Sequence, residues 1–159
     1  MRDTQGASAP SFFSKAAMPP LVVLDTNTVM ALWFFEDPRL TDLRLRVEAG
    51  RLLPACREDA LEELRRVLAY RQFGITPERQ ATLLESYRAR VKHAPAPTTD
   101  TPALPVCRDP DDQKFLEIAR DAGAALLLTR DKALLRLARH RLIRPLFAIV
   151  SPDRFDPAG

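Results

Sequence analysis

Short apolar runs alternate with longer amphipathic segments along this chain, and that pattern predicts strands alternating with helices. The apolar runs that predict strands lie at residues 21–24, 52–53, 104–107, 125–128 and 146–150. Segments with helical periodicity or capping signals lie at residues 28–35, 38–49, 58–70, 77–91, 109–123 and 131–139. This alternation indicates an α/β fold, a three-layer α/β/α sandwich with a central parallel sheet.

The predicted elements define one domain with short flanking segments. The folded domain is expected over residues 20–155, with a flexible N-terminal extension at 1–19 and a tail at 156–159. Inside the domain, residues 94–103 are rich in Pro and Thr and are predicted to form a surface loop. A chain of 159 residues, 46% of them hydrophobic, is long enough to bury one core.

Acidic residues follow three of the predicted strands. Asp25 comes directly after the first strand, a run from Asp109 to Asp112 follows the third, and Asp131 follows the fourth. In parallel α/β sheets, ligand sites lie outside the carboxyl ends of the strands. We therefore expect carboxylates from three separate segments to meet at one edge of the sheet.

Helical periodicity separates one inward-facing glutamate from its outward-facing neighbour. Glu62 has charged residues three and four positions away, so it is expected on the solvent-exposed face of its helix. Glu63 lies beside the leucine stripe of the same helix and is expected to point toward the protein, where a lone carboxylate is unfavourable unless it is compensated. Glu63 is therefore a candidate functional residue. The alternative is a glutamate at the rim, tethered to Arg66.

The same test favours Asp112 over Asp111. Asp112 has Phe115 and Leu116 three and four positions on, which places it on the core-facing stripe of the predicted helix. Asp111 has Lys114 three positions on and is expected to pair with it. Asp112 is therefore the candidate for chemistry.

Asp109 and Asp131 each have a structural alternative. Each directly precedes a predicted helix, and an aspartate in that position accepts hydrogen bonds from the free backbone N–H groups of the first turn. For Asp109 capping is the favoured interpretation, and Asp131 can serve both as a cap and as a site residue.

Any metal site in this chain must be built from carboxylates. Two cysteines and two histidines form no zinc pattern and no disulfide framework, and Cys56 and Cys107 are expected to be buried free thiols in a reducing cytoplasm. Carboxylates select hard cations such as Mg²⁺ or Mn²⁺. The net charge of +3 is weak evidence for a nucleic-acid partner, and no apolar run approaches the ~20 residues of a membrane span.

Four segments, "VLDTNTVM", "ALEELRRVLAYRQF", "CRDPDDQKFLEIA" and "LLLTRDKALL", occur in the order found in PIN-domain ribonucleases. The chain resembles most the members of that family that are toxins of bacterial toxin–antitoxin systems, and the resemblance covers residues 21–155. It implies an α/β/α sandwich with a Mg²⁺- or Mn²⁺-dependent endoribonuclease site. The four acids of that site match Asp25, Glu63, Asp112 and Asp131.

The resemblance also implies helper residues and partners. Asn27 and Thr129 match polar residues that orient the acids, and capping of the following helix or turn is their alternative role. Asp109 is a supporting candidate, and Arg108, Arg130 and Lys132 are candidates for binding the phosphates of RNA. A cognate antitoxin is the expected protein partner, and the aromatic residues at 33–35 could form a homodimer or partner surface.

Two other functions remain open at this point. In a phosphotransferase of the haloacid-dehalogenase type, Asp25 would attack phosphorus, but Asn27 stands where that chemistry needs a second acid. A non-catalytic PIN-like module that binds RNA or protein would need none of the acids.

Overall fold

Five parallel strands form the centre of the protein in a computed structural model that describes residues 19–156. In chain order they are β2 (Leu21–Leu24), β3 (Leu53–Cys56), β4 (Lys92–His93), β5 (Leu126–Leu128) and β6 (Ala148–Val150). Their order across the sheet is β4-β3-β2-β5-β6, so β2, the first of the described strands, is the central one. The expected parallel sheet is confirmed.

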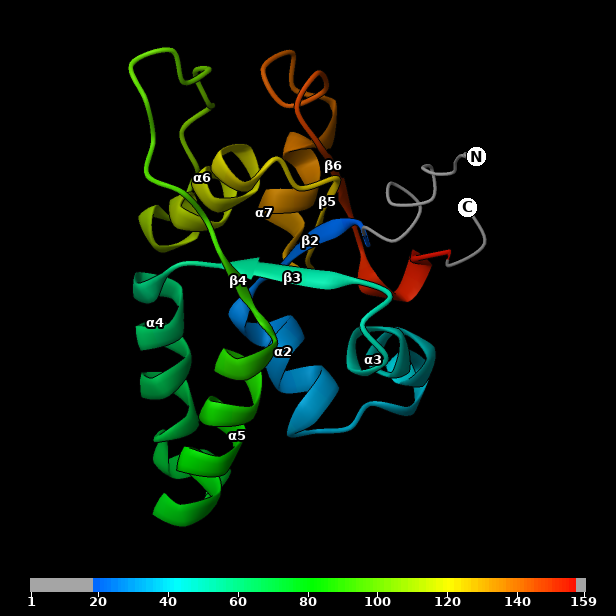
Figure 1. The fold of residues 1–159 in the computed structure, drawn as a ribbon, viewed down its shortest axis with the longest axis vertical. Helices are drawn as coiled ribbons and strands as arrows, with labels where there is room; N and C mark the ends of the chain where they lie inside the picture. The colour runs from blue at the N-terminus through cyan, green and yellow to red at the C-terminus, as the bar shows by residue number, and fades with distance from the viewer. Residues whose placement is uncertain (1–18, 157–159) are drawn as a thin grey trace, which may run out of the picture.

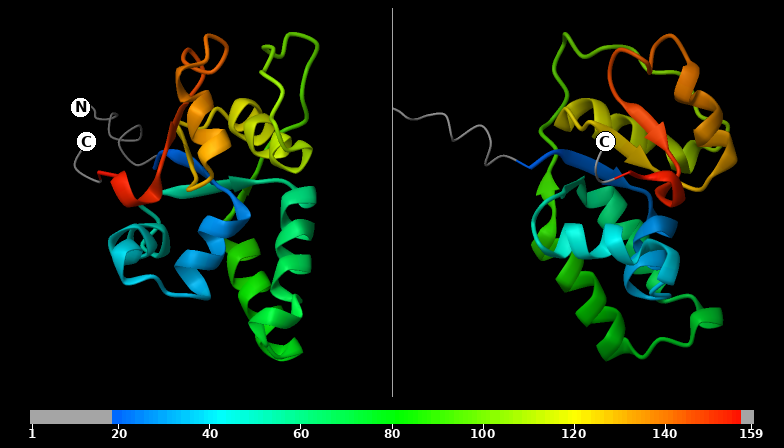
Figure 2. Two further views of the ribbon diagram at one scale, coloured as in Figure 1. Left: turned by 180° about the vertical axis from the view of Figure 1, so that it is seen from behind. Right: turned by 90° about the vertical axis from the view of Figure 1, so that its right-hand side faces the viewer.

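Helices lie on both sides of this sheet, as the sequence pattern predicted. They are α2 (Thr26–Trp33), α3 (Thr41–Glu48), α4 (Glu58–Leu68), α5 (Pro77–Arg90), α6 (Gln113–Ala122) and α7 (Lys132–Leu135). Figures 1 and 2 show α6 and α7 on one side of the sheet and the other four helices on the opposite side. The α/β/α sandwich is therefore confirmed.

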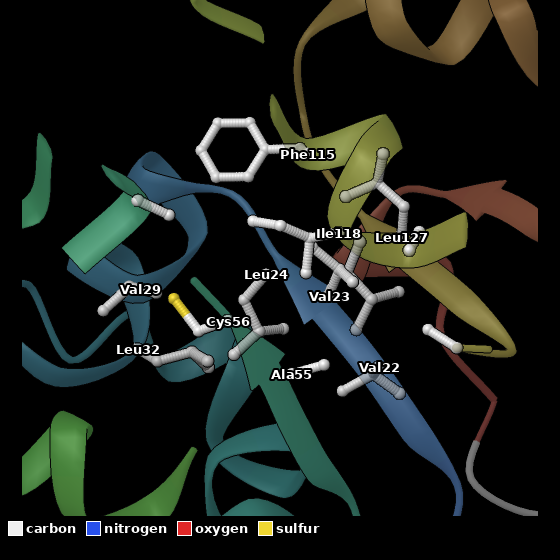
Figure 3. Close-up of a cluster of buried hydrophobic side chains, with 14 of the residues drawn as sticks. Val22, Val23, Leu24, Val29, Leu32, Ala55, Cys56, Phe115, Ile118 and Leu127 are labelled. Carbon is white, nitrogen blue, oxygen red and sulfur yellow. The ribbon is translucent and has the colours of Figure 1, made fainter. Parts of the chain in front are cut away.

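The core forms around β2. Val22 and Val23 are 0% and 1% exposed, and Leu127 of the neighbouring strand is 0% exposed. Val23 and Leu127 are partners in the register of β2 and β5 and so share a face of the sheet, and Figure 3 shows them near Ile118 of α6. Burying each such side chain contributes roughly 1.5–3 kcal/mol, so these contacts hold the carboxyl end of β2 in place.

Several element boundaries differ from the predicted ones. The predicted helices at 38–49 and 131–139 are each part 3₁₀-helix, at Pro38–Leu40 and Arg136–Arg139. Thr76 caps the N-terminus of α5, since its hydroxyl accepts a hydrogen bond from the Arg79 N–H at 3.2 Å. Gly50 and Gly123 follow the ends of α3 and α6 at positive φ, which glycine adopts without steric cost.

The strand predicted at residues 104–107 is wrong. This segment is irregular, because Pro105 has no N–H to donate to a sheet and the Gln113 side chain takes the place of a neighbouring strand. Gln113 accepts a hydrogen bond from the Cys107 N–H at 2.7 Å and donates one to the Pro105 carbonyl at 3.0 Å. The fifth strand is instead β4, two exposed polar residues that carry no apolar signal.

Three further expectations bear on the class of protein. Cys56 and Cys107 are buried and free, as predicted. Among the described residues, no helix combines the length and hydropathy that a membrane span requires. The extension and the tail fall mostly on residues 1–18 and 157–159, which lie outside the described part, and the single-domain organisation of 20–155 stays a prediction.

Replacing Tyr87 with Phe is expected to stabilise the protein by about 1 kcal/mol. Tyr87 is 4% exposed, and its hydroxyl has no hydrogen-bond partner among the described residues. Its side chain lines a cavity of about 30 Å³ between α2, α4 and α5. Urea unfolding of the two proteins measures the difference. A less stable variant would contradict the prediction and would mean that a water in this cavity binds the hydroxyl.

Candidate metal centre at the carboxyl edge of the sheet

Asp25 stands at the tip of the central strand and is held by three donors. It is the N-cap of α2, and its Oδ1 accepts hydrogen bonds from the Thr28 N–H at 3.0 Å and the Thr28 hydroxyl at 2.6 Å. Its Oδ2 accepts one from the Thr129 hydroxyl at 2.5 Å. Asp25 is 6% exposed and Thr129 is 0% exposed. The carboxylate is thus fixed between the ends of β2 and β5.

The surroundings of Asp25 disfavour its negative charge. Burial raises the pKa of this carboxyl above its usual value, the hydrogen bonds from Thr129 and Thr28 lower it, and the charge of Asp131 raises it further. No lysine, arginine or histidine of the described residues forms an ion pair with it. Asp25 is therefore a buried acid that a cation would stabilise.

Thr129 and Asp131 follow β5 and connect to Asp25. The Thr129 hydroxyl donates to Asp25 and accepts a hydrogen bond from the Asp131 N–H at 3.0 Å. Asp131 is exposed, and its Oδ1 accepts a hydrogen bond from the Leu134 N–H at 3.0 Å, so the expected cap of α7 is confirmed. The Thr129 hydroxyl thus makes both contacts left open by the sequence, one to Asp25 and one that caps the following turn, and its role in orienting the acids stays a prediction.

Glu63 of α4 reaches toward the same edge of the sheet. Its Oε2 accepts a hydrogen bond from the Thr26 hydroxyl at 2.5 Å, and its Oε1 lies 2.5 Å from the Lys114 Nζ. Its side chain is 20% exposed, in agreement with an inward-facing position. The alternative tether to Arg66 is wrong, because Arg66 pairs with Glu62 at 3.7 Å.

Asp112 lies among the other acids without a partner. It ends the 3₁₀-helix Pro110–Asp112, and within the described residues its carboxylate makes no hydrogen bond or ion pair. Burial raises the pKa of this carboxyl to about 6, and four neighbouring acids raise it too, in decreasing order Asp131, Asp109, Asp25 and Glu63. The acids singled out in the sequence therefore gather around Asp112.

The remaining polar candidates divide into caps and exposed residues. The Asp109 Oδ1 accepts a hydrogen bond from the Asp111 N–H at 2.9 Å, which confirms its capping role. Asn27 is exposed and caps nothing, since Asp25 caps α2. The expected pairing of Asp111 with Lys114 is wrong at the side chain, because the Lys114 ammonium donates to the Asp111 backbone carbonyl.

The predicted phosphate-binding residues have different surroundings. Arg130 pairs with Asp37 and Asp153, each at 2.8 Å, and so joins the α2–α3 connection to the C-terminal 3₁₀-helix. Arg108 and Lys132 are exposed, and neither forms an ion pair within the described part of the chain. Of the three, Arg130 is therefore the one whose charge is already paired with carboxylates in the structure.

Sequence reasoning missed two residues at this edge, Thr26 and Lys114. Thr26 is 6% exposed and bonds to Glu63, yet in the sequence it is only one more small residue of the DTNT segment. Lys114 stands two positions after Asp112, and the spacing along its helix pointed to Asp111 as its partner. Its contact with Glu63 joins residues 51 positions apart, which no local pattern reveals.

The acids suit a hard divalent cation in chemistry and in charge. All four are oxygen donors, and unpaired Asp112 lies in a field of like charge that a cation would relieve. They are not arranged as a ready-made cage, since no three of the described acids, histidines or cysteines are placed to hold a metal ion together. At Glu63, Lys114 and Thr26 each contact one of the two carboxylate oxygens.

Comparison with known proteins agrees with this geometry. A family model described as PIN domain matches residues 21–133, which include all four acids. No curated protein matches the chain. PIN domains are generally metal-dependent nuclease modules that bind RNA. Because the match covers most of the chain, the chain belongs to the PIN-domain family.

Proposed function

We propose that this protein is an endoribonuclease that hydrolyses RNA phosphodiester bonds with Mg²⁺ or Mn²⁺. The observation that carries the proposal is the unpaired Asp112 carboxylate, whose pKa is raised by burial and by four other acids. Functional sites are where such perturbed carboxylates gather. Asp25, Asp112, Asp131 and Glu63 are the residues that would hold the metal.

The bound cation would neutralise charge on the phosphodiester and lower the pKa of an attacking water. The chain's own side chains do the positioning. Thr28 and Thr129 fix both oxygens of Asp25, and Thr129 also accepts a hydrogen bond from the backbone that carries Asp131. Asp25 serves in this scheme as an oriented ligand. It is not the nucleophile of a phosphotransferase, since Asn27 stands where that chemistry needs an acid.

A basic segment next to the acids supports an anionic substrate. From Lys132 to Pro152 the sequence has five lysines or arginines and no aspartate or glutamate. The five, Lys132, Arg136, Arg139, Arg141 and Arg144, are all exposed, and none forms an ion pair within residues 19–156. Exposed cations of this kind bind the phosphates of nucleic acid. The segment begins one residue after Asp131, so RNA bound along it would reach the acids.

A role as the toxin of a toxin–antitoxin pair in the cytoplasm is the finer part of the proposal, and the resemblance of the motifs supports it. A cognate antitoxin would be the partner. A surface for it, or for a second copy of the chain, is an aromatic patch of Phe34, Phe35, Tyr70 and Phe73, whose rings contact one another. Phe35 and Tyr70 are 56% and 49% exposed, more than a core role would leave them.

Incubation of the purified protein with single-stranded RNA tests the activity. Cleavage products are expected with Mg²⁺ or Mn²⁺ and are expected to vanish with EDTA, since the acids cannot act together without a cation. Gel analysis of end-labelled RNA measures both. Cleavage that persists in EDTA would contradict the metal requirement. RNA binding without cleavage in either metal would favour the non-catalytic module.

A further inference from the structure

Lys114 places an ammonium group among the acids. Its Nζ lies 2.5 Å from Glu63 Oε1, and the same nitrogen donates to the Asp111 carbonyl at 2.5 Å. It also lies 5.2 Å from the centroid of the Phe115 ring. The side chains of Lys114 and Glu63 are 14% and 20% exposed, so the ion pair is largely withdrawn from solvent.

This pair is more buried than most ion pairs among the described residues, although Arg120–Asp121, with side chains 14% and 4% exposed, is buried further. Most of them join residues on the surface, where screening leaves little energy. Within the described residues, Lys114 is the cation that pairs with any of the four candidate acids, while Asp25, Asp112 and Asp131 have none. Lys114 is also anchored by the 3₁₀-helix Pro110–Asp112 that precedes α6, through its contact with the Asp111 carbonyl. Its charge therefore has a fixed place at the site.

We propose that Lys114 is an internal counter-ion that holds Glu63 in the metal-free protein and competes with the divalent cation for it. This inference rests on the proposed function. One oxygen of Glu63 accepts from the Lys114 ammonium and the other from the Thr26 hydroxyl, so a metal that binds Glu63 takes a carboxylate whose charge is already paired. Metal loading is then an exchange of one cation for another.

The charge of Lys114 is expected to affect both the affinity for the metal and the repulsion among the acids. A cation that recruits Glu63 must take this carboxylate from the Lys114 ammonium, which weakens metal binding by about tenfold at protein-like dielectric. When no metal is bound, the ammonium pairs the charge of Glu63 and so reduces its repulsion with Asp112, Asp25 and Asp131. Lys114 acts through Glu63, so it is a positioning residue.

The test measures the affinity of the full-length protein for Mn²⁺ by calorimetry. Lys114→Met and Lys114→Gln are each expected to bind Mn²⁺ about tenfold more tightly than the wild type, and Lys114→Arg within about threefold of it. The matched control is Lys92→Met, because Lys92 is an exposed lysine of β4 without an ion pair among the described residues. That control is expected to bind as the wild type does.

A double variant separates competition for Glu63 from a general effect of charge. In a Glu63→Gln background, Lys114→Met is expected to change Mn²⁺ affinity by less than about threefold, since the contested carboxylate is gone. The inference is overturned if Lys114→Met and Lys114→Gln bind no more tightly than wild type, or if the gain survives in the Glu63→Gln background. A wild type that neither binds Mn²⁺ nor cleaves RNA would instead overturn the proposed function.

Discussion

Asp112→Asn is expected to reduce RNA cleavage by roughly 100-fold or more while making the metal-free protein more stable. Of the four candidate acids, Asp112 is the one whose carboxylate has no hydrogen bond or ion pair among the described residues, so its charge is available to a metal and uncompensated without one. The amide keeps the shape of the side chain and removes that charge. Cleavage rates in Mn²⁺ and unfolding in EDTA measure the two effects.

The stability effect depends on pH in a defined direction. The pKa of Asp112 is about 6 in the folded protein against an ordinary value of 3.8, so the folded state disfavours its ionised form. Below about pH 4 the carboxyl is protonated in both states, and as the pH rises from about 4 to 6 stability is lost, by about 1–3 kcal/mol in all. Asp112→Asn is expected to lack this loss.

Asp111→Asn is the matched control for this prediction. It removes the same charge one residue earlier in the same 3₁₀-helix, and Asp111 is exposed. Its cleavage rate is expected to stay within about threefold of wild type, because an exposed charge is well screened. Equal losses in both variants would mean that overall charge, and not the position of Asp112, governs the activity.

Asp25→Ala is expected to destabilise the protein by about 3 kcal/mol as well as abolish cleavage. The change removes three hydrogen bonds at once and leaves the Thr28 N–H and the Thr129 hydroxyl without their acceptor in a site that is almost fully buried, while the Thr28 hydroxyl keeps the Leu128 carbonyl at 3.2 Å. Urea denaturation gives the loss of stability, and circular dichroism shows whether the fold is kept.

Thr76→Ala provides a comparison for Asp25→Ala, since Thr76 also caps a helix but is exposed and accepts one hydrogen bond. It is expected to lose about 1 kcal/mol and to keep its cleavage activity. Similar losses of stability in Asp25→Ala and Thr76→Ala would show that Asp25 stabilises the fold no more than an exposed cap does. Its proposed role as a metal ligand is tested separately with Asp25→Asn, and retained cleavage in that variant would contradict the role.

Much of the fold and part of the site could be predicted from local pattern. The apolar run at 21–24 predicts a buried strand, and the helical periodicity around Glu63 and Asp112 predicts which face of each helix points to the core. Both patterns correspond to burial in the structure. Capping by Asp109 and Asp131 is likewise a property of a few consecutive residues. These features depend on neighbours within one or two turns.

The elements and contacts that differ from the predicted ones depend on residues more than one helical turn away in the sequence. The apolar run at 104–107 satisfies its backbone with the Gln113 side chain, so an apolar pattern did not become a strand. Strand β4 is polar and exposed, and it exists because it pairs with β3. Lys114 turns to Glu63 on another helix, a choice made by tertiary packing.

The central position of β2 has a consequence for how the protein is made. Its two neighbours in the sheet begin about 30 and 100 residues later, at Leu53 and Leu126, so β2 leaves the ribosome well before either can pair with it. Contacts this distant slow folding, because the chain must close large loops first. The hydrogen bond from Thr129 to Asp25 spans 104 positions, so the acidic edge takes shape only after most of the chain has been synthesised. The contact between the two strand ends that carry Asp25 and Asp131 is therefore among the last long-range contacts of this site that the growing chain can form.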